Sequence, residues 1–114
     1  MVTSISFLHC SIGLTLVKLI AMPKFVIERE MPNVGNLTQE QLQEAAQTSC
    51  NVLMEMGPQI QWIHSYVTDN KIYCIYQAAD EASIKKHAEK AGFPADKISR
   101  VKAVIDPATA EATV

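Results

Sequence analysis

The sequence predicts an α+β domain of the ferredoxin-like kind, with elements in the order β-α-β-β-α-β. Three observations predict it. A short alternating strand opens the domain, two helical segments each run from a capping residue to a glycine stop, and a β-hairpin lies between these helices. The order implies a four-stranded antiparallel sheet with both helices on one face, so the other face is left open.

The first strand is expected at residues 24–30, where Phe25 and Ile27 alternate with Glu28 in "KFVIERE". The side with Phe25 and Ile27 suits the face that the helices cover. Glu28 is therefore expected on the open face.

Each helix is expected to begin at a capping residue and to end at a glycine. Thr38 and Gln41 form a capping box ahead of the first helix, and the glycine–proline pair at 57–58 ends that helix. Asp80 suits the N-cap of the second helix, and Gly92 suits its C-terminal stop.

The hairpin is expected to join residues 60–68 to residues 71–78 through Asp69-Asn70, which can take the positive φ angles of a two-residue turn. This register predicts three pairs on one face of the sheet: Tyr66 with Tyr73, His64 with Ile75, and Trp62 with Gln77. The opposite side is more uniformly apolar and suits the helices. Trp62, Tyr73 and Ile75 are thus expected on the open face, and such an exposed apolar patch favours a homodimer that covers it.

The domain is expected to span residues 22–107, with a last strand at about 98–105. Residues 108–114 carry no turn, cap or core signal and are expected to be loose. Residues 1–21 are almost continuously apolar, but the run is short for a membrane span and contains Lys18. We interpret this segment as an extension upstream of the true domain, with a weak uncleaved anchor or signal as the alternative. No stable membrane insertion is expected.

Charge and cysteine content narrow the function classes. Ten Lys and Arg residues against 12 Asp and Glu residues leave no basic field for a nucleic-acid backbone. The three cysteines, Cys10, Cys50 and Cys74, form no CxxC motif, which predicts a reduced cytoplasmic protein without a disulfide. Cys50 and Cys74 are interpreted as core residues.

The candidate metal ligands are His64, Glu28, Tyr66 and His87. His64, Glu28 and Tyr66 would offer an imidazole, a carboxylate and a phenol on the open face, a set that suits a divalent transition metal or a general base beside a small ligand. His87 lies on the second helix, where a solvent-edge position is the simpler interpretation. One chain offers few histidines in the domain, so a tight site would depend on carboxylates or on a second subunit.

Four segments, "MPKFVIERE", "WIHSYVTDNKIYCIY", "HAEKAGFPADKI" and "VIDP", together resemble a family of small bacterial proteins of unknown function that are labelled nickel-binding-protein-like. The resemblance covers nearly all of Met22 to Pro107. It implies a ferredoxin-like fold, a homodimer and binding of nickel or a similar divalent ion. It implies no established reaction and fixes no ligand set.

Three functions follow as hypotheses. The first is a dimeric metal-binding protein that sequesters or senses nickel or another divalent ion without catalysis. The second is a dimeric α/β-barrel-type enzyme, or a small-molecule-binding protein, that uses the open face. The third is an interaction module whose aromatic face only forms the dimer.

Overall fold

The computed structural model describes residues 22–111 and confirms the ferredoxin-like prediction. Antiparallel strands form one four-stranded sheet in the order β2-β3-β1-β4. The elements, in chain order, are β1 (Lys24–Glu30), the 3-10 helix η1 (Val34–Asn36), α3 (Gln39–Met56), β2 (Ile60–Val67), β3 (Lys71–Ala78), α4 (Glu81–Ala91), β4 (Lys97–Arg100) and α5 (Pro107–Ala110).

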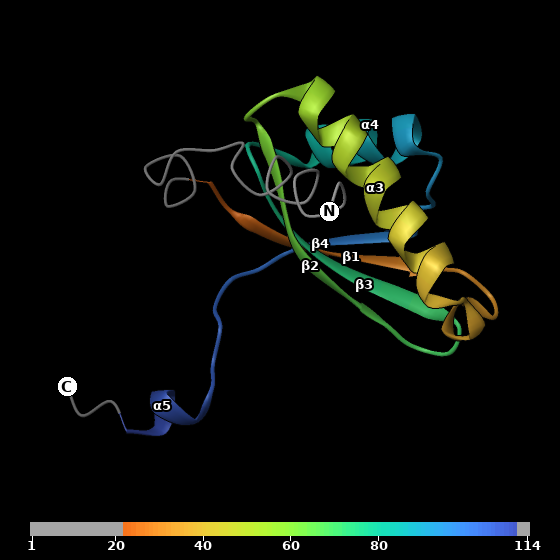
Figure 1. Ribbon diagram of the computed structural model, residues 1–114. Coiled ribbons are helices and arrows are strands. Elements are labelled where there is room, and N and C mark those ends of the chain that lie inside the picture. The colour runs from red at the N-terminus through yellow and green to blue at the C-terminus, as the bar shows by residue number, and fades with distance from the viewer. Residues whose placement is uncertain (1–21, 112–114) are drawn as a thin grey trace, which may run out of the picture.

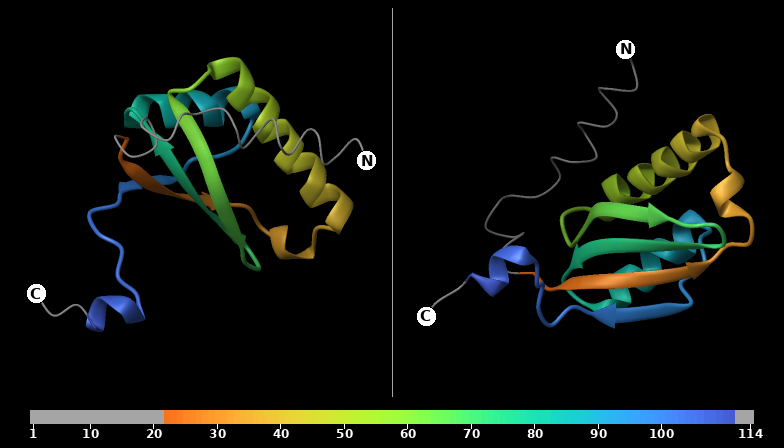
Figure 2. Two further views of the ribbon diagram at one scale, coloured as in Figure 1. Left: turned by 60° about the vertical axis from the view of Figure 1, so that its left-hand side comes forward. Right: turned by 90° about the horizontal axis from the view of Figure 1, so that it is seen from below.

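The two long helices cover one face of the sheet, as Figure 1 shows, and leave the other face open. Seen from the open side, the strands lie in front and the helices behind them (Figure 2, right). The core fills the space between these layers. Its buried members are Phe25, Ile27, Leu53, Ile60, Cys74, Tyr76, Ala78 and Ile84. The alternation that predicted Phe25 and Ile27 on the helix side is therefore confirmed.

The helix ends are those that the sequence predicts. Thr38 accepts a hydrogen bond from the Gln41 backbone while the Gln41 side chain accepts one from the Thr38 backbone, which completes the capping box of α3. Asp80 caps α4 through the Ser83 backbone N–H, and Gly92 ends this helix with a φ angle of 78°. Each cap satisfies backbone groups that the helix leaves unpaired, and so fixes where the helix starts or stops.

Two local predictions are wrong. Thr68 and Lys71 face each other across the hairpin turn, as expected. Asp69 and Asn70 between them do not have the positive φ angles that the expected turn requires, because the only non-glycine residue within 22–111 with a positive φ is Asn33. The last strand ends at Arg100 rather than near residue 105. Its partner β1 starts at Lys24, whose carbonyl accepts a hydrogen bond from the Val101 N–H, and among residues 22–111 no strand pairs with the residues that follow.

The segment after β4 runs away from the sheet and carries α5 (Figure 1). Val104 and Ile105 in this segment are 68% and 78% exposed. The expectation that the tail has no cap is wrong at its start, because Asp106 and Thr109 form a capping box.

Residues 1–21 and 112–114 lie outside the described residues, as do the predictions made for them. Within residues 22–111, no helix combines the length and apolar character needed to cross a membrane.

The two cysteines among residues 22–111 differ in their state. Cys74 is a buried free thiol on the helix side of the sheet, as expected. Cys50 is buried on α3 but forms a disulfide, so the prediction of a chain without disulfides is wrong at this residue. Disulfides persist mainly in oxidising compartments, so the cysteines no longer predict a reducing one.

Gly35 lets η1 lie directly against the hairpin turn. Its N–H donates to the Asp69 carbonyl at 3.0 Å, and an added Cβ would lie 2.8 Å from Asp69 Cα and 2.9 Å from Thr68 O. Both neighbours are backbone atoms, so the chain itself would have to move.

We expect Gly35→Ala to lower the free energy of unfolding by about 1–3 kcal/mol. Urea denaturation measures this loss. Asn36→Ala, at the exposed next residue, is the control and should change stability by about 0.5 kcal/mol or less; equal stability of the two variants would contradict the contact.

Candidate functional site

The open face is arranged in cross-strand rows. Tyr66 on β2 pairs with Tyr73 on β3, which pairs with Glu28 on β1. The adjacent row holds His64, Ile75 and Val26 in the same strand order. The predicted placement of these residues on one face is confirmed, as is the hairpin register from His64 to Val67.

Trp62 does not belong to this face, and that prediction is wrong. A β-bulge between Trp62 and His64 makes Trp62 pair with Tyr76 instead of Gln77, so its indole turns to the helix side. There it packs against the core, and its Nε1 donates to Ser65 Oγ at 2.9 Å. A one-residue change in register moves a side chain to the opposite face, which is why strict alternation failed here.

His64 and Tyr66 form a contacting pair. His64 Nε2 lies 3.0 Å from the Tyr66 hydroxyl, and the rings meet edge to face with centroids 4.9 Å apart. Both side chains are exposed, Tyr66 to 59%. They lie on the same side of β2 because every second residue of a strand points to the same face.

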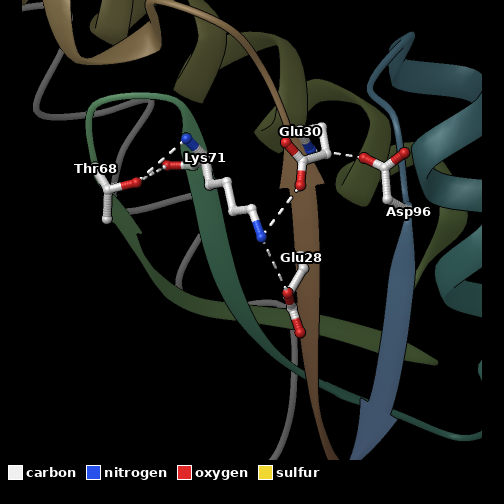
Figure 3. Close-up of polar contacts among 5 residues, drawn as sticks. All are labelled: Glu28, Glu30, Thr68, Lys71 and Asp96. Carbon is white, nitrogen blue, oxygen red and sulfur yellow. Dashed lines mark hydrogen bonds and ion pairs between the residues drawn. The ribbon is translucent and has the colours of Figure 1, made fainter.

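Glu28 lies at a distance from this pair. It is two strands away from Tyr66, which is about 10 Å between backbones. Figure 3 shows its carboxylate reaching Lys71 on β3, at 3.8 Å, with Glu30 reaching the same ammonium at 3.1 Å. The pKa of Lys71 is raised, mainly by its hydrogen bond and charge interaction with Glu30.

His87 cannot share a site with His64, so the four-residue set is wrong in this member. It is a residue of α4, on the face of the sheet opposite His64, and its side chain is 0% exposed. Its Nε2 lies 3.3 Å from Ser49 Oγ, and the centre of its ring lies 5.3 Å from that of the Tyr76 ring. Burial lowers the pKa of His87 to about 4; the Ser49 backbone opposes this shift and Arg29 adds to it. His87 is therefore a neutral core histidine at neutral pH, not the solvent-edge residue that the helical position suggested.

Residues 22–111 of a single chain do not form a complete metal site. Within residues 22–111, no three His, Cys, Asp or Glu side chains lie close enough to hold an ion together. His64 and Tyr66 offer one nitrogen and one oxygen donor on β2. Glu28 offers a carboxylate on β1, two strands away from Tyr66. Further donors would have to come from outside this part of the chain.

Arg29 is the residue that sequence reasoning missed. The run of charges Glu28-Arg29-Glu30 at the end of β1 suggests exposed side chains that keep the sheet soluble, yet Arg29 is only 2% exposed. Alternation along β1 places it on the same side as Phe25 and Ile27, which was the available signal. A buried charged side chain is rare and calls for an explanation.

The fold and the open-face donors define a small α+β protein with a candidate site for a divalent ion on an uncovered sheet. Residues 25–101 match the family described as "Nickel responsive protein SCO4226-like", and the chain belongs to this family. The resemblance seen in the sequence is therefore confirmed, and the family's name indicates nickel responsiveness.

A solved structure supports the fold. SCO4226 from Streptomyces coelicolor A3(2) is similar to the chain with a TM-score of 0.62 and 21% sequence identity, over 72% of this chain and 99% of that chain. At this identity the likeness carries the fold alone. No curated protein matches the chain.

Proposed function

We propose that the protein is a homodimer that binds nickel, or another divalent transition metal, on the open sheet face and sequesters or senses the ion without catalysis. The observation that carries this proposal is the pair of donors, His64 Nε2 and the Tyr66 hydroxyl, 3.0 Å apart on that face. Membership of the nickel-responsive family supports the choice of metal.

The spacing of the pair suits a metal. Two donors at right angles, each about 2.1 Å from an ion, are themselves about 3 Å apart. Imidazole nitrogen and oxygen donors in square-planar or tetragonal sites are typical of Ni²⁺ and Cu²⁺. His64 would hold the ion most directly, with Tyr66 beside it, and Glu28 remains the proposed carboxylate.

A second copy would complete the site and cover the face. A twofold axis through the open face would bring a second His64 and Tyr66 pair toward the first, because an isologous interface uses the same residues twice. It would also cover Tyr73 and Ile75, which are half-buried in the single chain. The exposed Val104 and Ile105 offer apolar surface for the same contact.

Calorimetric titration of nickel into the full-length dimer, with zinc for comparison, tests the proposal. We expect saturable binding with a fixed stoichiometry per dimer. We also expect His64→Ala to lower the nickel affinity at least about tenfold, because even the loss of a residue that only supports a metal ligand typically lowers metal affinity about 10–100-fold. Glu28→Gln tests the carboxylate in the same assay.

His87→Gln is the matched control, because this histidine lies on the opposite face and should leave nickel affinity unchanged. Unaltered nickel affinity in His64→Ala would remove His64 from the site. Absence of any heat beyond dilution in the wild-type protein would reject the metal proposal as a whole.

A further inference from the structure

The guanidinium of Arg29 is buried with only part of its hydrogen-bonding capacity used. Its Nε donates to Cys74 Sγ at 3.3 Å and its Nη1 donates to the Pro94 carbonyl at 2.5 Å. The group also lies 5.6 Å from the centre of the Phe93 ring. Its Nη2 is buried without a hydrogen-bond partner.

No negative charge compensates this cation in the described part of the chain. The ion pairs there join Lys71 to Glu28 and Glu30, and Lys85 to Glu81, and none involves Arg29. Its partners are a thiol, a backbone carbonyl, the Phe93 ring and the Tyr76 hydroxyl, none of which carries a negative charge at neutral pH. Arginine side chains stay protonated in proteins, and a buried charge is costly unless an opposite charge accompanies it.

Arg29 lines a cavity of about 100 Å³ between α3 and the sheet. The walls are almost entirely apolar: Leu42 and Ala46 come from α3, and Trp62 and Ile72 from the sheet. The exposed Val67 lies at its rim, so the cavity reaches the surface. The bulge in β2 helps to build it, because it turns Trp62 onto this side.

We propose that this cavity binds a small organic carboxylate, with an aromatic or branched apolar body beneath α3 and its carboxylate paired with Arg29. An apolar cavity of about 150 Å³ holds benzene in another protein. The present cavity is smaller, about 100 Å³, but it opens to the surface, so a single ring can lie partly inside it. The planar guanidinium matches a carboxylate in two parallel hydrogen bonds. The mostly apolar walls favour such a ligand over inorganic phosphate, which has no apolar part to bury.

This ligand site is independent of the proposed metal site. The two lie on opposite faces of the sheet and share no residue. Failure of nickel binding would leave the carboxylate proposal untouched, and the reverse also holds.

Thermal unfolding of the full-length protein with added benzoate tests the proposal, with benzyl alcohol as the uncharged probe of similar shape. A ligand that binds only the folded state raises the melting temperature with its concentration. We expect both probes to raise it, and benzoate to bind about tenfold more tightly or better, because hydrogen bonds to charged groups are stronger than neutral ones.

Arg29→Met removes the charge and keeps an apolar side chain of similar length. It should weaken benzoate binding about tenfold or more and leave benzyl alcohol nearly unaffected. Arg100→Met, at the exposed end of β4, is the matched control and should bind both probes as the wild type does. Ala46→Phe fills the cavity from α3 and should abolish binding of both probes while Arg29 remains.

Three results would overturn the proposal. The first is no saturable effect of benzoate on the wild type. The second is equal loss of benzoate binding in Arg29→Met and Arg100→Met, or none in either. The third is unchanged binding in Ala46→Phe, which also decides the question if Arg29→Met fails to fold.

Discussion

Acidification from about pH 7 to about pH 4.5 is expected to destabilise the folded protein by about 2 kcal/mol through His87 alone. This histidine is 0% exposed, and its pKa falls from 6.5 to about 4 on folding because burial disfavours the imidazolium. The groups around it cannot rescue the charged form. Ser49 and Tyr76 are neutral, and the Arg29 cation lowers the pKa of His87 further.

The sign follows from proton binding. Between pH 6.5 and about pH 4, the unfolded chain binds a proton at His87 while the folded chain does not. Protons therefore favour unfolding, and stability falls as the pH is lowered through this window and levels off below it. Asp80 adds a loss only at lower pH, since hydrogen bonds from Ser83 hold its pKa below the ordinary 3.8.

Urea unfolding across this pH range measures the slope directly. His87→Gln can keep a hydrogen bond to Ser49 but does not titrate, so we expect it to flatten the slope even if it lowers stability overall. His64→Gln removes the exposed imidazole and serves as the matched control at the same protein concentration. A slope that persists in His87→Gln, or that is flattened by His64→Gln instead, would contradict the assignment.

The fold was predictable because each element carries its own local signals. The capping box at Thr38, the Asp80 N-cap and the stop at Gly92 act within a few residues, so sequence alone reveals them. The end of β4 was not predictable in this way. The sequence of residues 101–105 is typical of a strand, but in the described part of the chain β4 pairs only with β1, which starts at Lys24, and this pairing ends at Arg100.

The candidate site was predictable only where alternation held. His64, Tyr66 and Glu28 follow a regular strand pattern, and they lie on the open face as expected. Trp62 escaped because a bulge leaves no clear signal in one sequence. His87 escaped because the depth of a helical side chain depends on how α4 packs on the sheet, which tertiary contacts decide.

A charge at the centre of the open face should separate the proposed dimer. Ile75 lies half-buried in the row between His64 and Val26, where a twofold interface would bring it close to its own copy. Ile75→Lys would place one positive charge from each copy in the buried interface, where neither has an opposite charge as partner. We expect the dimer dissociation constant to rise at least about 100-fold, as the cost of an unpaired charge in an interface is several kcal/mol.

Sedimentation velocity over a range of protein concentrations measures this change. Met54→Lys, an equally drastic substitution at an exposed apolar residue of α3, is the control and should leave the dimer intact. If the ion is held between two copies, Ile75→Lys should also lower nickel affinity although it removes no ligand. Dimers that survive Ile75→Lys, or a wild-type chain that stays monomeric at every concentration, would show that something other than a second copy covers this face.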